Sequence, residues 1–378
     1  MTQFDAIIIG AGIIGTAAAR ELARAGMSVA IVESGSPGSG ITSAGMGHVV
    51  AMDGSPAQLA LTVFSRSLWR KDAAQFPSNI EYESPGTIWI AADEAEMAAV
   101  GAKVKSYAAA GVSTRILSAQ ALAQAEPNLR SGLAGGLLVS EDGITDPPAV
   151  AAYYLQQAQE SGAVLFSSRA IAAGDGQVAL ANGLSLSAPR IVLATGFDCS
   201  LMPALPIQKR KGHLAITDRY PGFLSHQLVE LGYIHSAHTL ESDSVAFNVQ
   251  PRSNGQIVIG SSRQYGNDDP GIDGEILEKM LARAAEYMPN LASLSQIRTW
   301  TGFRAATIDK FGKLPLIGPA LGVSDDPTLW LAVGFEGLGI TSAPGAARLL
   351  ADHMLDRESP IDPRPYLPSR LAKTKEKA

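Results

Sequence analysis

The sequence predicts an α/β fold in which a mainly antiparallel α+β domain is inserted into a domain built on a parallel sheet. Three observations lead to this prediction. Residues 5–33 have the pattern of strand, helix and strand, which is the βαβ unit of parallel sheets. Residues 212–264 instead have the pattern of antiparallel strands. A last buried strand and helix follow over 329–355, so the start, middle and end of the chain supply the parallel domain.

The first strand and helix surround a glycine-rich turn. The continuous β-branched run over 5–9 ends at Gly10, as expected of a buried parallel strand. Apolar residues at helical spacing then predict a helix over 13–25 and, after it, a strand over 28–32. Residues 34–47 are rich in glycine and serine and predict a long loop.

The middle of the chain alternates helices and strands. Apolar residues recur at helical spacing over 56–76, and alternation over 86–90 predicts a strand. An acidic first turn opens a predicted helix over 93–110. A helix over 148–161 precedes short strands that end at 190–196.

The second half of the chain contains the clearest hairpin. It pairs 245–250 with 256–262 around the turn residues Ser253-Asn254-Gly255. The remaining predicted elements are a helix over 274–287, an extended segment over 296–307, a buried strand over 329–333 and a helix over 342–355.

The length of 378 residues fits two domains of ordinary size. The sequence has no internal repeat that would divide it further. We expect the parallel domain to comprise 1–50, 141–205 and 300–378, and the inserted domain to comprise 51–140 and 206–299.

The composition indicates a globular protein without a nucleic-acid surface. Hydrophobic residues make up 46% of the chain and charged residues 17%, which excludes disorder as the main state. Lys and Arg number 30 against 36 Asp and Glu, a net charge of −6, whereas a nucleic-acid footprint requires positive charge. The 38 glycines suggest a backbone that turns sharply or lies close to a large ligand.

The single cysteine and the lack of a long apolar run in the sequence predict the cellular compartment. Cys199 alone cannot form an intrachain disulfide, a Cys-x-x-Cys redox pair or a thiolate metal site. The longest uncharged apolar run, 6–19, is shorter than the roughly 20 residues of a membrane-spanning helix, and no basic leader precedes it. We expect a cytoplasmic protein without a transmembrane segment, with peripheral contact to the inner membrane as the alternative.

The turn after the first strand has the G-x-G-x-x-G pattern of dinucleotide-binding folds. In Gly10-Ala11-Gly12-Ile13-Ile14-Gly15, Gly10 makes the tight turn, Gly12 admits a pyrophosphate and Gly15 packs the helix on the strand. The amino end of the helix faces the phosphates. The alternative is a glycine-rich turn in another α/β protein.

An acidic residue at the end of the second strand supports the dinucleotide prediction. Glu33 can accept hydrogen bonds from a ribose diol, and its charge repels the 2′-phosphate of NADP. Ser34 follows it at the same edge of the sheet. NAD and FAD both satisfy this pattern, so a plain NAD dehydrogenase stays open at this point.

Further segments carry a family resemblance. Four of them, in chain order, are Thr42-Ser43-Ala44-Gly45-Met46, Ala194-Thr195-Gly196, Trp300-Thr301-Gly302-Phe303-Arg304 and Gly337-Leu338-Gly339-Ile340-Thr341. Together with the dinucleotide motif, they resemble the FAD-dependent D-amino-acid oxidase, glycine oxidase and sarcosine oxidase family. The ending Glu336 to Thr341 is most similar to D-hydroxyproline dehydrogenase-like members and to glycine-oxidising cyanide synthases.

This resemblance implies a glutathione-reductase-type, Rossmann-like FAD domain and noncovalently bound FAD. It implies that the first, second and fourth segments contact the flavin, together with Gly302. It also implies oxidation of a small amino acid by hydride transfer from Cα to flavin N5, giving an imine. We favour a cyclic D-amino acid such as D-hydroxyproline or D-proline. The alternatives are a glycine or sarcosine oxidase, and a flavin-bearing electron-relay subunit of a dehydrogenase complex.

The same resemblance suggests which residues face the substrate. Arg304 would grip the substrate carboxylate with its planar fork. Glu336 would receive the substrate ammonium or a ring hydroxyl, with a local ion pair or cap as the alternative. Phe247 and Asn248 stand where relatives have a substrate-facing tyrosine, with strand packing as the alternative. His48 is close enough in sequence to the flavin loop to approach the ring, and a satisfied loop histidine is the alternative.

The electron acceptor and the assembly stay open in the sequence. O2, a quinone and a partner redox subunit are all compatible with the resemblance. We expect no nucleic-acid partner and no metal, and both homo-oligomers and hetero-oligomers are compatible with the sequence.

Overall fold

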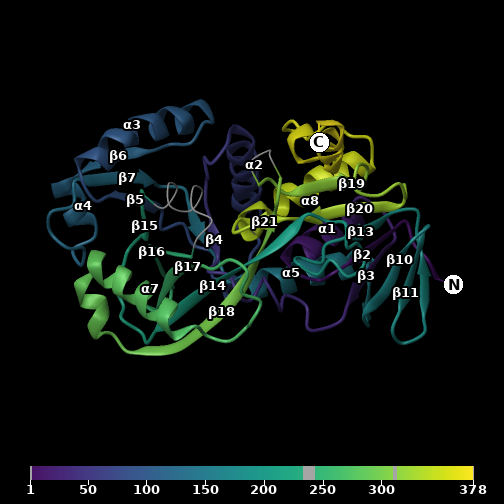
Figure 1. Ribbon diagram of the computed structural model, residues 1–378, viewed down its shortest axis with the longest axis horizontal. Coiled ribbons are helices and arrows are strands. Elements are labelled where there is room, and N and C mark those ends of the chain that lie inside the picture. The colour runs from purple at the N-terminus through teal and green to yellow at the C-terminus, as the bar shows by residue number, and fades with distance from the viewer. Residues whose placement is uncertain (1, 233–242, 310–312, 378) are drawn as a thin grey trace.

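The computed structural model describes residues 2–232, 243–309 and 313–377. Residues 233–242, part of the expected antiparallel region, lie outside this description. Figure 1 shows the parallel sheet in one half of the molecule and helices α3, α4 and α7 in the other, with the long strands β14 and β18 between them.

A six-stranded sheet forms the first half. It is parallel except for one antiparallel edge strand, β19. Its strands, in spatial order, are β19 (Leu316–Pro319), β20 (Leu329–Val333), β13 (Ile191–Leu193), β2 (Ala6–Ile9), β3 (Val29–Glu33) and β9 (Val164–Ser167).

Both faces of this sheet are buried, which explains the continuous apolar run in β2. Because side chains alternate along a strand, Ile8 packs with the helices and Ile7 with a small second sheet. The helices on one face are α1 (Ile13–Arg24), α5 (Pro147–Glu160) and α8 (Gly339–Met354). The second sheet consists of β1 (Thr2–Gln3), β12 (Ser185–Ser187), β11 (Gln177–Leu180) and β10 (Ala170–Gly174).

A nine-stranded, mainly antiparallel sheet forms the other half. Its only parallel pair in the described residues is β15 with β5. In spatial order the strands are β21 (Phe335–Glu336), β18 (Gln296–Thr307), β14 (Ile207–Thr217), β17 (Ile257–Arg263), β16 (Ser244–Pro251), β15 (Gln227–Glu230), β5 (Thr87–Ala91), β7 (Gly135–Val139) and β6 (Arg115–Ser118).

Helices cover this second sheet on both faces. Apolar residues of α4 (Ala119–Ala125) and α7 (Gly274–Tyr287) join one core cluster, and those of α3 (Glu94–Ala109) join another. The remaining elements are α2 (Pro56–Ala73), the paired β4 (His48–Val49) and β8 (Gly143–Ile144), and short 3-10 helices at Ser78–Ile80, Pro289–Ser293, Arg364–Tyr366 and Pro368–Lys377.

The predicted elements are present with small shifts. The predicted helix over 274–287, the extended segment over 296–307 and the strand over 329–333 have the predicted bounds. The hairpin is confirmed as β16 and β17. The last helix begins three residues earlier than predicted, at Gly339, because the Ser342 amide already donates to the Leu338 carbonyl at 2.9 Å.

Two segments do not follow the expected division of the chain into two domains. The boundary at residue 300 falls inside β18, which pairs with β14 along nearly its whole length. Helix α2, expected in the inserted domain, packs on α8, where Trp69 Nε1 donates to the Thr341 carbonyl at 2.9 Å. None of the helices that the structure describes has the length and apolar character needed to cross a membrane.

Candidate active site

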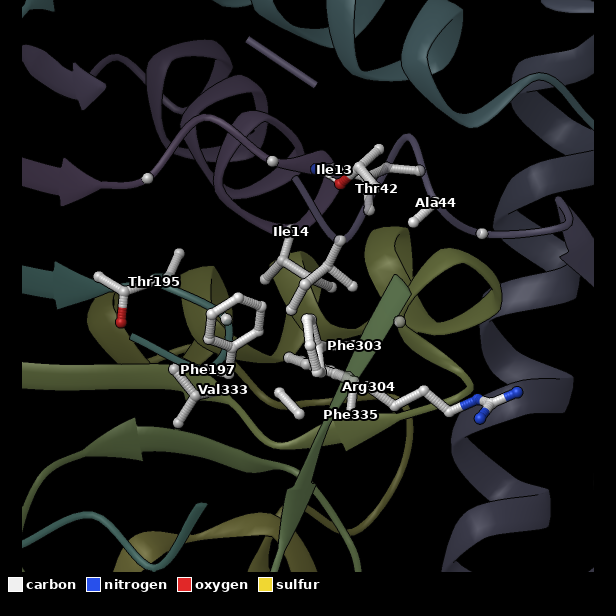
Figure 2. Close-up of a pocket in the computed structure, with 18 of the residues that line it drawn as sticks. Ile13, Ile14, Thr42, Ala44, Thr195, Phe197, Phe303, Arg304, Val333 and Phe335 are labelled. Carbon is white, nitrogen blue, oxygen red and sulfur yellow. Dashed lines mark hydrogen bonds between the residues drawn. The ribbon is translucent and has the colours of Figure 1, made fainter. Parts of the chain in front are cut away.

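A cavity of about 470 Å³ lies between the two sheets, at the carboxyl ends of β2, β3 and β13. Ligands of open parallel sheets bind at this edge. The predicted residues that line it are Gly10, Gly12, Ile13, Ile14, Glu33, Ser34, Thr42, Ala44, Gly45, Met46, His48, Ala194, Thr195, Gly196, Asn248, Gly302, Arg304, Glu336, Gly337, Gly339 and Ile340. Figure 2 draws part of this wall and labels ten of its residues, including Ile13, Thr195 and Arg304.

The glycines of the first motif are required by close packing. Gly10 has φ +107°, and a Cβ on it would lie 2.5 Å from the Ala194 carbonyl oxygen. A Cβ on Gly15 would lie 1.9 Å from the Gly10 carbonyl oxygen, which explains why Gly15 packs behind the turn and does not line the cavity. Gly12 is the N-cap of α1 and has no side chain between the helix end and the cavity.

The Glu33 carboxylate is fixed at the cavity wall by two backbone groups. Its Oε2 accepts from the Ala11 amide (2.7 Å) and its Oε1 from the Gly35 amide (2.8 Å). A carboxylate has further lone pairs, so Glu33 can still accept hydrogen bonds from a ribose diol. The Ile13 amide donates to Thr42 Oγ1 at 3.0 Å and joins the loop after β3 to the start of α1 (Figure 2).

Glycines also line the far end of the cavity. A Cβ on Gly302 would lie 2.4 Å from the Ala44 Cβ, and one on Gly45 would lie 2.5 Å from Ile340 Cδ1. Gly302 lies opposite Gly212 in the β14–β18 register, so the two strands present bare backbone there. A glycine turn, a fixed carboxylate and this bare patch along one cavity fit the phosphates, the ribose and the flat ring of FAD.

Besides Gly15, three predicted cofactor residues lie outside the cavity wall. Ser43 is exposed and donates to the Gly40 carbonyl at 3.1 Å. Leu338 is the N-cap of α8, and Thr341 is buried between α8 and the backbone of residues 48–50. Leu338 and Thr341 therefore hold the loop and helix in place instead of forming the wall.

The Arg304 side chain passes over Gly212 of the neighbouring strand to reach the cavity. Its Nη1 donates to the Ser262 carbonyl at 2.9 Å, across the intervening strand β14. A Cβ on Gly212 would lie 2.8 Å from that Nη1, so only glycine leaves room for the guanidinium. Figure 2 shows the Arg304 side chain leading away from the rings of Phe303 and Phe335.

Glu336 belongs to an arginine cluster. Its Oε1 lies 3.2 Å from Arg263 Nη2 and 3.5 Å from Arg210 Nη1, and its Oε2 accepts from the Gly337 amide at 2.7 Å. Burial alone would raise the pKa of Glu336, but Arg263, Arg304 and Arg210 lower it to about 2. The structure thus gives Glu336 the ion-pair role, because its oxygens already face these cations.

Phe247 is a correction to the expected site. Its ring is fully buried on the far face of the sheet and stacks on Tyr287 with centroids 4.5 Å apart. Its neighbour Asn248 lines the cavity instead, because successive side chains of a strand point to opposite faces.

The surroundings of His213 and Cys199 give both residues a structural role. His213 is buried, its Nδ1 lies 2.9 Å from Ser262 Oγ, and its Nε2 accepts from the Asp273 amide at 3.0 Å. Cys199 packs against the core cluster under β10 to β12 and is not among the residues of the cavity wall.

Sequence reasoning missed several residues of the wall. Phe197 and Phe303 meet edge to face with centroids 5.6 Å apart, and Phe335, Gly212 and Ser261 also line the cavity. Gly212 had a readable signal, because glycine inside a strand marks close approach of another group. Phe197, directly after the predicted turn at 194–196, had a positional one.

Comparison with known proteins identifies the family. Residues 5–353 match the model of the FAD dependent oxidoreductase family. The glycine oxidase of Pseudomonas aeruginosa is 28% identical over 385 residues, covering 96% of this chain and 98% of its own. The crystal structure of glycine oxidase from Geobacillus kaustophilus has a TM-score of 0.85 at 24% identity, over 98% of this chain and 99% of its own.

The crystal structure of L-proline dehydrogenase from P. horikoshii has a TM-score of 0.86 at 21% identity, over 99% of both chains. These structural likenesses show the fold, and the family match covers the glycine turn, the glycine patch and Arg304 together. The chain belongs to the FAD dependent oxidoreductase family, and FAD is its cofactor.

Proposed function

We propose that the protein oxidises a small amino acid by removing hydride from its Cα, giving an imine. The observation that carries this proposal is the Arg304 guanidinium at the cavity wall, beyond the glycine patch formed by Gly212 and Gly302. An α-carboxylate bound by Arg304 would place the adjacent Cα next to this patch. FAD, when bound, accepts the hydride.

The residues that would hold FAD follow from the cavity wall. The turn at Gly10 and Gly12 and the amino end of α1 would face the pyrophosphate, and Glu33 would accept from the ribose. Ala44, Gly45 and Gly302 would flank the ring, and the amino end of α8 at Gly339 would offer N–H groups to the ring oxygen. We propose that these contacts are noncovalent, because Cys199, the one cysteine of the chain, packs against a core cluster and is not among the wall residues.

Arg304 can hold the carboxylate by two charge-assisted hydrogen bonds. Within the part of the chain that the structure describes, its guanidinium makes one hydrogen bond, from Nη1 to Ser262. Its other N–H groups can therefore donate to a planar carboxylate. Such a grip fixes the direction of the Cα–H bond, which hydride transfer requires.

The amine would have to reach the reacting position without its extra proton. Burial lowers the pKa of His48, and its Nε2 lies 3.2 Å from the Asn248 amide nitrogen, so His48 does not offer a free base. Glu336 is committed to arginines. The ammonium proton therefore passes to water before hydride transfer, and the substrate reacts as the neutral amine.

For the substrate itself, we favour a cyclic D-amino acid such as D-hydroxyproline or D-proline. This preference rests on the segment Glu336 to Thr341 and its resemblance to D-hydroxyproline dehydrogenase-like proteins. Glycine or sarcosine is the second candidate, supported by the P. aeruginosa glycine oxidase relative.

The test is the visible spectrum of the FAD-loaded protein without oxygen. D- and L-proline, the hydroxyproline isomers, glycine, sarcosine and D-alanine are added one at a time. Bleaching of the flavin band near about 450 nm by one of them supports the proposal, and the fastest identifies the class. A flavin that none of them reduces favours the electron-relay alternative. Peroxide formation in air then separates O2 from a quinone or a partner subunit as acceptor.

A further inference from the structure

A chain of buried and partly buried hydrogen bonds ends at the cavity wall. It begins at the Gly143 carbonyl, which accepts from Gln227 Nε2 at 3.1 Å. Gln227 Nε2 also donates to Thr87 Oγ1 at 3.2 Å, and Gln227 Oε1 bonds to His48 Nδ1. His48 Nε2 lies 3.2 Å from Asn248 Nδ2. The chain therefore joins β8, β15, β4 and β16.

Each proton in this chain has a defined position. A carbonyl oxygen only accepts, so the NH2 group of Gln227 must face Gly143, and Oε1 must face His48. His48 therefore carries its proton on Nδ1 and accepts at Nε2. Asn248 must then donate from Nδ2, which leaves Oδ1 as the only polar atom of its amide outside the chain.

Burial preserves this assignment of donors and acceptors along the hydrogen-bond chain. Gln227 is fully buried and Asn248 is 7% exposed. Burial lowers the pKa of His48 and outweighs its hydrogen bonds to Gln227 and Asn248, so the imidazole is neutral at neutral pH. A protonated imidazole would place a second N–H against the NH2 group of Asn248.

The chain of hydrogen bonds ends at Oδ1 of Asn248, a hydrogen-bond acceptor. Among residues 2–232, 243–309 and 313–377, no group donates to the buried Asn248 Oδ1. Native proteins satisfy nearly all buried polar atoms, so an unpaired one at a cavity wall points to a ligand. The matching group on a ligand is a hydrogen-bond donor.

The position of Asn248 relative to Arg304 indicates which group of the ligand supplies this hydrogen-bond donor. Asn248 is directly opposite Gly260 on β17, and Arg304 donates to the carbonyl of Ser262, two residues further along β17. Asn248 and Arg304 both line the cavity, so a small ligand can lie between their side chains. A ligand whose carboxylate meets Arg304 would thus place a group on its Cα toward Asn248.

We propose that Asn248 Oδ1 accepts a hydrogen bond from the substrate amine, and that His48 and Gln227 are positioning residues that fix it as an acceptor. This inference rests on the proposed function and specifies its substrate class. The neutral amine must keep an N–H, so primary and secondary amines are accepted. Tertiary amines, which have no N–H in the neutral form, are rejected.

Two ring carboxylates of the same size test the inference on the FAD-loaded protein. Pyrrole-2-carboxylate offers a ring N–H and furan-2-carboxylate only a ring oxygen, and neither needs to be oxidised. Their dissociation constants are measured from the change in the flavin spectrum. We expect the wild-type protein to bind the pyrrole about tenfold more tightly, the ordinary effect of one hydrogen bond.

Three variants separate the role of Asn248 as hydrogen-bond acceptor from the roles of Gln227 and His48 in orienting its amide. Asn248→Ala should bring the ratio of the two dissociation constants to about one, while Asn254→Ala, the same change in the exposed β16–β17 turn, should leave it unchanged. Gln227→Met removes the anchor but keeps Asn248, so both amide orientations become available and the ratio should also fall. His48→Leu should act in the same direction, with thermal melting to confirm folding.

The outcomes are distinct. A ratio that stays near tenfold in Asn248→Ala overturns the acceptor role, and one that falls only in Asn248→Ala overturns the positioning role. A wild-type ratio near one overturns the whole inference. If neither carboxylate perturbs the flavin, the Arg304 anchor is absent, and the proposed function fails together with the inference. If both bind with the expected ratio but no amino acid bleaches the flavin, the proposed function alone fails.

Discussion

Replacing Glu336 by Gln tests whether the arginine cluster is held together by this one carboxylate. The side chain is 19% exposed and lies within 3.5 Å of both Arg210 and Arg263. These cations and Arg304 lower its pKa from the usual 4.5 to about 2. At about 1.4 kcal/mol per pKa unit, the ionised form stabilises the folded state by about 3 kcal/mol.

The sign of the pH dependence follows from the direction of this change. The folded-state pKa of Glu336 is below the unfolded one, so its contribution is complete above about pH 4.5 and is lost as the pH falls toward 2. By pH 3.5, about 1.4 kcal/mol of it should be gone. Glu336→Gln lacks the contribution at every pH, so the stability gap between the two proteins should narrow on acidification.

Urea unfolding at saturating FAD, followed at pH 7 and at pH 3.5, measures this gap. Glu275→Gln is the control, because Glu275 is exposed and pairs with exposed Lys279, a contact that contributes little to stability. A Glu336→Gln protein as stable as the wild type at pH 7 would refute the electrostatic reasoning. A gap of the same size at both pH values would refute it as well.

Four further variants test the site. Arg304→Ala should lower kcat/KM about 100-fold to 10,000-fold, because it removes two charge-assisted hydrogen bonds to the substrate carboxylate, while FAD stays bound. An electron-relay subunit with the same substitution would keep its electron transfer. Gly212→Ala should raise KM about tenfold or more, because its Cβ displaces Arg304; steady-state kinetics measures both effects. Gly302→Ala should lower the FAD content, read from the absorbance ratio at about 450 and 280 nm, while Gly274→Ala, with nothing within 4 Å of the new methyl, should not. Phe247→Ala should reduce the free energy of unfolding by about 4 kcal/mol in urea titrations but leave kcat/KM of the folded enzyme unchanged, since its ring stacks on Tyr287 away from the cavity.

The parts of the site that the sequence predicted are those specified by short segments. The turn from Gly10 to Gly15 and the carboxylate of Glu33 belong to one βαβ unit, so their spacing alone places them together. Arg304 was predicted because the segment 300–304 resembles a segment of the family, and the structure places Arg304 at the same cavity.

The parts that the sequence could not predict depend on contacts between distant segments. Gln227 bonds to His48, 179 residues away, and Glu336 lies against Arg210 and Arg263. No local pattern marks these pairs, because each residue by itself has the pattern of an ordinary strand position. They become visible only when the sheets are assembled, because His48 lies on β4, which pairs with β8, and the other four residues lie on separate strands of the nine-stranded sheet.

The choice between Phe247 and Asn248 shows how register controls the chemistry of the site. Alternation along β16 predicts that one of the two faces the cavity, but the strand has an irregular register between Val245 and Asn248, which the sequence does not reveal. Since a slip of one residue turns every side chain to the other face, such a slip would present the Phe247 ring where the Asn248 amide now stands. The pairing of Asn248 with Gly260 therefore decides whether a bound amine meets a hydrogen-bond acceptor or an apolar surface. Because the anchor of Arg304 lies on the same strand as Gly260, one sheet register sets both ends of the proposed amino-acid site.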